Sequence, residues 1–233
     1  TLGVGLLLVG LTTYSQSSHA PTVAIVEVVA GLVLLLGYVQ SSRGRAGALI
    51  PLPVLVETRF LRSTAAAFGQ MFCLGTVLVA LPLFFTGPLD MSSGVASVLL
   101  FTLPTLMAFG APVVSRLSLS VGPRPVLRAG LLVLALGSVV TGAVAASGHG
   151  GATAAALSGM LVVLGIGMAM VQTPAAAGAT SSPAGAYGAA VGLFSMVRFS
   201  GSATAAAWVA LIYPTGSMML LFGGCAVLTL VAF

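Results

Sequence analysis

Eight runs of mainly apolar residues follow one another along this chain, and they limit its fold more than any other feature. A helix needs about 20 apolar residues to cross a bilayer, and in lipid its backbone must satisfy its own hydrogen bonds. The runs meet or approach this length at residues 2–15, 22–40, 63–85, 94–114, 125–146, 152–176, 186–212 and 217–233. The sequence therefore predicts an all-α membrane protein with about eight transmembrane helices.

The composition excludes a water-soluble domain. Of the 233 residues, 58% are hydrophobic and only 5% are charged, and the mean hydropathy is +1.18, which leaves too few polar residues to cover a soluble surface. The net charge of +5 does not indicate nucleic-acid binding, because the arginines lie in loop clusters next to apolar helices and form no basic face.

The distribution of charge predicts the orientation of the helices. Seven of the eight basic residues lie in two connections, residues 41–62 and 115–128. Asp90 lies in the connection between the two apolar runs that separate them, 63–85 and 94–114. Basic loops are retained on the cytoplasmic side, so we expect a multi-pass protein of the cell inner (plasma) membrane with both ends of this chain in the cytoplasm. Phe84 and Phe85 then fall near the outer interface and Phe60 near the inner one, where an aromatic belt is expected.

Four stretches resemble one family in their order and spacing. They are Pro51-Leu-Pro-Val-Leu-Val-Glu-Thr-Arg-Phe60, residues 110–130 around Gly122-Pro-Arg124, Gly165-Ile-Gly-Met-Ala-Met-Val-Gln-Thr-Pro174, and Gly192-Leu-Phe-Ser-Met-Val-Arg-Phe-Ser-Gly201. This series resembles the C-terminal portion of major facilitator superfamily transporters, in the fourteen-helix drug:proton antiporter branch. Leu119 and Ser120 stand where the family carries an acidic-basic pair.

The resemblance implies a domain organisation and a gating loop. Residues 1–40 correspond to an inserted transmembrane helix pair, 41–62 to a cytoplasmic linker and 63–233 to the C-terminal six-helix bundle. The missing N-terminal six-helix bundle would be supplied by the same chain or by a partner. The gating loop would contain Arg116, Gly122, Arg124 and Arg128.

Arg198 is the foremost candidate for a functional residue. It lies near the middle of the run 186–212, where a charge costs at least about 2.5–3.5 kcal/mol on insertion scales, so it should face the bundle or a water-filled cavity. Ser195 lies on the same polar stripe and replaces the Asn of the family pattern. Three interpretations stay open: a structural arginine bonded to backbone carbonyls, a substrate or proton-coupling residue, and a lipid-facing position that snorkels.

Three further polar residues lie inside apolar runs. Glu27 is either a carboxyl near headgroup depth or a proton carrier, since apolar surroundings raise the pKa of a carboxyl group. Gln70 and Gln172 either join helices by hydrogen bonds or orient a substrate in a central cavity.

Small residues predict close helix packing. Gly188 and Gly192 form a G-x-x-x-G pattern that permits close approach of a neighbouring helix. We expect Gly165, Gly167, Pro174 and Gly201 to contribute to packing and bending in the same way.

The sequence predicts neither an enzyme nor a cofactor. His19 and His149 have no second ligand at metal spacing, and the chain lacks paired carboxylates, a phosphate loop and a Ser-His-Asp set. The resemblance instead implies a secondary transporter that exports hydrophobic or cationic small molecules by proton antiport. The alternative is a non-transporting membrane scaffold or complex subunit that retains the transporter fold.

Overall fold

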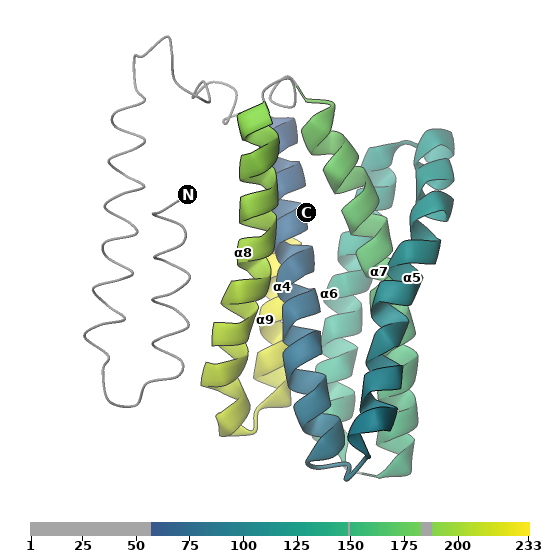
Figure 1. Cartoon of the computed structure of the whole chain (residues 1–233), viewed down its shortest axis with the longest axis vertical. Coiled ribbons are helices and arrows are strands. Elements are labelled where there is room, and N and C mark those ends of the chain that lie inside the picture. The colour runs from purple at the N-terminus through teal and green to yellow at the C-terminus, as the bar shows by residue number, and fades with distance from the viewer. Residues whose placement is uncertain (1–56, 149, 183–187) are drawn as a thin grey trace, which may run out of the picture.

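The computed structural model describes residues 57–148, 150–182 and 188–233 (Figure 1). Within this part the chain is all-helical. Its α-helices are α4 (Thr58–Thr86), α5 (Ser93–Val121), α6 (Pro123–Ser147), α7 (Gly151–Thr180), α8 (Gly188–Ile212) and α9 (Met218–Val231), with the 3₁₀ helix η2 (Tyr213–Thr215) between the last two. The predicted helix pair 1–40, which includes Glu27, and the linker up to residue 56 lie outside the described residues.

The helices coincide with the predicted apolar runs and extend most of them by a few residues. Four of them, α4, α5, α6 and α7, are long and apolar enough to cross a membrane. α4 begins at Thr58, so the last residues of the predicted linker 41–62 are already helical. The extensions add turns at the helix ends, where polar residues can satisfy backbone groups outside the hydrocarbon.

α4 is the central helix of the bundle and packs against α7, α8 and α9 (Figure 1). Small residues allow these contacts. A Cβ on Gly75 of α4 would lie 3.0 Å from the Ser202 Cα of α8, and a Cβ on Gly178 of α7 would collide with the Ser63 hydroxyl of α4. Because lipid supplies no hydrophobic driving force between helices, this close packing of small residues is what holds the bundle together.

The helical connection between α5 and α6 corrects the loop predicted at residues 115–128. α5 continues through Val121 and α6 begins at Pro123, so Gly122 alone links them. Gly122 adopts φ +92°, which glycine tolerates because it has no Cβ, and Pro123 is accepted at the start of a helix because its missing N–H would have no partner there. Arg116 therefore belongs to α5, while Arg124 and Arg128 lie on α6.

The aromatic residues near the ends of α4 do not form the predicted belt. Phe84, Phe85 and Phe60 are 1%, 0% and 2% exposed and pack in the core. They do lie near the ends of α4, but they point into the core, because the direction of a side chain depends on which neighbours surround its helix.

Candidate functional site: an apolar groove beside α5

A groove of about 700 Å³ runs between α4, α5 and α7. Its walls are apolar apart from Ser97 and Gln172, and the Ser97 hydroxyl already donates to the Ser93 carbonyl at 2.8 Å. The residues lining it are Leu74, Leu78, Ser97, Leu100, Phe101, Pro104, Met107, Ala108, Ala111 and Gln172. An apolar cleft with few polar groups is the usual form of a small-molecule site.

Gln172 supplies the available polar group of the groove. Its side chain is partly buried on α7, and its Oε1 atom is buried without a hydrogen-bond partner in the described part of the chain. A buried acceptor left unpaired costs about 1–3 kcal/mol. Gln172 is the one amide side chain in the lining, and its buried acceptor can pair with a molecule in the groove only if the side chain turns toward it.

Gln70 is not among the residues that line the groove. It is completely buried, and neither its Oε1 nor its Nε2 atom has a partner among the described residues. Leu74, one turn further along α4, lines the groove.

Arg198 lies near the middle of α8 and is partly buried. Its guanidinium carbon is 5.3 Å from the centre of the Phe199 ring, and its Nε atom is buried without a hydrogen-bond partner in the described part of the chain. Ser202, one turn further along, packs on Gly75 of α4, so the same face of α8 places Arg198 beside α4. Ser195 is partly buried one turn before it.

The predicted packing residues fall into two groups. Gly165 approaches Leu106, Gly167 approaches Val133 and Leu134, and Gly201 lies against the backbone of Phe68. Pro174 is buried inside α7. In contrast, a Cβ on Gly188 or Gly192 would meet nothing within 4 Å, so the predicted close approach at this G-x-x-x-G pattern is not formed within the described ranges.

Much of the groove was not predicted from the sequence. α5 supplies most of its lining, yet buries only Ala96, Leu103 and Val114. Phe101 and Phe109 are 70% and 76% exposed, but in a sequence they resemble any other apolar residue of a membrane span. The signal that could have indicated the groove is the pair of prolines Pro104 and Pro112 within α5, since proline bends a helix.

The described residues contain no group of three His, Cys, Asp or Glu side chains that could hold a metal ion. Cys73 and Cys225 are buried free thiols at the contact of α4 with α9. The groove can therefore recognise a ligand by its shape, by apolar contact and by the amide of Gln172.

Long apolar helices with a groove along one side of their bundle define a multi-pass helical membrane protein. The family model of the Major Facilitator Superfamily matches residues 1–206, and the chain belongs to this superfamily. Its members are secondary transporters, not enzymes, that bind small-molecule substrates in a lipid bilayer. The comparison with curated proteins gives no match.

Proposed function

We propose that this chain is the C-terminal portion of a proton-coupled antiporter that exports hydrophobic or cationic small molecules. The observation that carries the proposal is the mainly apolar groove between α4, α5 and α7, whose lining includes Gln172, a residue with a buried acceptor that has no partner among the described residues. Such a site binds an apolar molecule by burying its apolar surface and orients it through one hydrogen bond. The resemblance to the fourteen-helix drug:proton antiporters supports the same substrate class.

The exposed side of α5 supports the proposal that a second helix bundle covers it in the full-length protein. Phe101 lines the groove and is 70% exposed, so the groove is open along α5. In a transporter with two bundles that rock about a central site, the N-terminal six-helix bundle would close this side. Residues 1–40 would then be the inserted helix pair and 63–233 the C-terminal bundle.

The carboxylates limit where a proton can be carried. Glu57 precedes the first turn of α4 and Asp90 follows its end, and these are the acidic residues of the described part of the chain. No described membrane-crossing helix therefore holds a carboxylate, and an arginine stays protonated in proteins. We infer that the coupling proton is carried by Glu27 or by a carboxylate outside these 233 residues.

The test is transport by the full-length protein in everted vesicles with an acidic interior. Addition of a lipophilic cation should release protons through the wild type and collapse the pH gradient reported by a quenched dye. We expect Gln172→Leu to weaken the apparent substrate affinity about two- to tenfold, because a hydrogen bond contributes about 0.5–1.5 kcal/mol. Ile166→Ala, on the exposed side of α7, is the control and should transport normally.

Arg198 is tested in the same assay with two variants. Arg198→Ala removes the charge, and Arg198→Lys keeps the charge but loses the planar fork of donors. Loss of transport in both indicates hydrogen bonding by the guanidinium group, whereas recovery in Arg198→Lys indicates charge alone. Unchanged efflux by Arg198→Ala at normal expression would remove Arg198 from the mechanism.

The second candidate function is a membrane scaffold that retains the fold without transport. The chain has only three acidic residues, and Leu119 and Ser120 replace the acidic-basic pair of the family's loop, which favours this alternative. A full-length wild type that is correctly inserted but behaves like empty vesicles with a range of lipophilic cations would contradict antiport and support the scaffold.

A further inference from the structure

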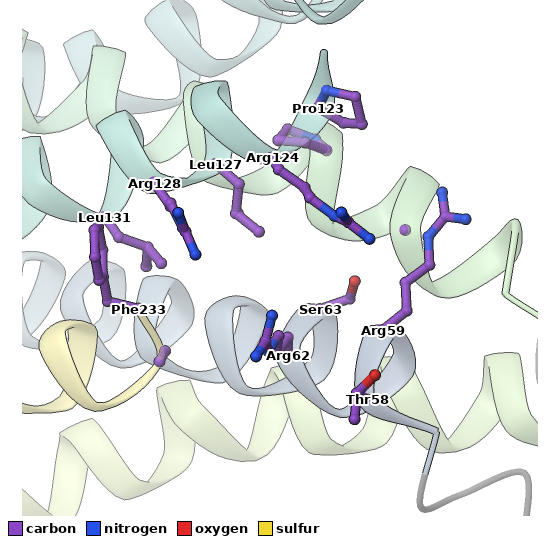
Figure 2. Close-up of a pocket in the computed structure, with 13 residues that line it drawn as sticks. Thr58, Arg59, Arg62, Ser63, Pro123, Arg124, Leu127, Arg128, Leu131 and Phe233 are labelled. Atoms are coloured by element: carbon purple, nitrogen blue, oxygen red, sulfur yellow. The ribbon is translucent and has the colours of Figure 1, made fainter.

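Arginines from two helices converge at the end of the bundle where α4 and α6 begin (Figure 2). Arg59 and Arg62 come from the first turns of α4, and Arg124 and Arg128 from the first turns of α6. All four line one pocket of about 100 Å³, together with Thr58, Ser63, Pro123, Leu127, Leu131, Pro174, Gly178, Ala232 and Phe233. Figure 2 shows Arg124 and Arg128 extending from α6 toward α4, on which Arg59, Arg62 and Ser63 lie.

The described residues do not neutralise this charge. The whole chain holds three acidic residues in total, and Asp90 lies at the opposite end of α4. No ion pair joins the four arginines to a carboxylate of the described residues, and the Glu57 Oε2 atom has no hydrogen-bond partner there. Two helix N-termini and the C-terminal ends of α7 and α9 meet at this pocket, so their partial charges of about ±0.5 offset each other. The guanidinium charges remain.

Within the described part of the chain, two of the arginines have partners and two do not. Arg59 Nη2 donates to Ser181 Oγ at 2.9 Å, and the Arg128 guanidinium lies 5.4 Å from the centre of the Phe233 ring. Arg62 and Arg124 form no hydrogen bond with the described part of the chain, although each guanidinium carries five N–H donors. The pocket thus presents positive charge and free donors from two helices.

We propose that this pocket binds a phosphate group between Arg62 and Arg124, with Arg59 and Ser63 beside it. A cavity holds a water molecule once it offers about 10–15 Å³, so about 100 Å³ accommodates a tetrahedral anion. The planar fork of arginine matches phosphate oxygens in pairs. Basic pockets between helices at the cytoplasmic side bind anionic headgroups, and this pocket lies at the ends of helices that are long and apolar enough to cross a membrane. The proposal does not rest on antiport.

The ligand has two sources, the headgroup of an anionic phospholipid or a soluble phosphate, and two arms of the experiment separate them. In the first, native mass spectrometry of the full-length protein measures retention of phosphatidylglycerol against phosphatidylcholine. In the second, the melting temperature is measured in phosphatidylcholine nanodiscs with inorganic phosphate, against chloride at the same ionic strength. A ligand that binds the folded state raises the melting temperature as its concentration exceeds Kd.

The test variant is the double substitution Arg62→Gln and Arg124→Gln. The control is Arg116→Gln, which removes a charge at the same end of the bundle but outside the pocket. Arg62 and Arg124 are exposed, so the core stays intact, and the single variant Arg124→Gln provides a milder test. We expect wild type and Arg116→Gln to retain phosphatidylglycerol at least about tenfold better than the double variant, since two charge-assisted hydrogen bonds are lost.

A lipid source is indicated by selective phosphatidylglycerol retention in the first arm. A soluble source is indicated by phosphate stabilisation of the wild type, but not of the double variant, in the second arm. The proposal is overturned if neither arm distinguishes wild type from the double variant, or if Arg116→Gln loses as much binding as the double variant, because diffuse charge would then explain the effect.

Discussion

Gly201 of α8 lies directly against the backbone of Phe68 of α4. A Cβ at position 201 would collide with the Phe68 carbonyl oxygen and lie 3.1 Å from the Phe72 amide nitrogen. Neither atom can move without displacing α4. We therefore expect Gly201→Ala to destabilise the protein by about 1–3 kcal/mol, the usual cost of overpacking, measured as a lower melting temperature in detergent.

The matched control is Gly192→Ala on the same helix. Nothing lies within 4 Å of its added Cβ, and alanine is favoured over glycine inside a helix by about 0.5–1 kcal/mol. Its melting temperature should equal or exceed that of the wild type. Equal melting temperatures for the two variants would contradict the close contact between α8 and α4.

The helices themselves were predictable because membrane crossing requires length and apolarity, and both are visible in the sequence. The segment 115–128 was the exception. Its serines and arginines suggested a loop, but Ser118 and Ser120 lie within α5, and the Ser120 hydroxyl donates to the Leu117 carbonyl at 2.9 Å. A polar residue can stay helical at the end of a span, so polarity alone did not indicate where the helix ends.

The pairing of helices was not predictable from the sequence. The pattern at Gly188 and Gly192 predicted a helix contact that is not formed within the described ranges, whereas Gly201, also predicted to pack, makes the contact with α4 from a different face of α8. Glycine spacing shows that close approach is possible and does not say which face meets a neighbour. For the same reason the sequence placed Gln70 and Gln172 in similar roles, whereas only Gln172 lines the groove.

Gln70 gives a prediction of increased stability. Its amide is completely buried, and neither polar atom has a partner in the described ranges. Because an unpaired buried amide costs about 1–3 kcal/mol, Gln70→Met, which preserves the shape of the side chain approximately, should raise the melting temperature in detergent. A lower melting temperature would show that Gln70 is hydrogen-bonded in the full-length protein.

The two cysteines should be inert in the folded protein. Cys73 of α4 and Cys225 of α9 are both 0% exposed, and the Cys73 thiol donates to the Cys225 carbonyl at 3.8 Å. We expect no labelling by a maleimide in mild detergent and labelling of both thiols in SDS. Leu119→Cys, at an 86% exposed position, serves as the reactive control. Labelling of Cys73 at the rate of that control would contradict the packing of α4 on α9.

The common placement of the arginines predicts the orientation of the bundle in the membrane. Arg59, Arg62, Arg124 and Arg128 line one pocket at one end, whereas Ser147 lies at the far end of α6. Since basic ends are retained in the cytoplasm, alkaline phosphatase fused after Gly122 in the full-length protein should be inactive, and the same enzyme fused after Ser147 should be active. Fusions to a protein that fluoresces only in the cytoplasm should give the opposite pattern. Activity of both phosphatase fusions, or of the Gly122 fusion alone, would show that this end faces outward and would move the phosphate-binding pocket to the outer leaflet.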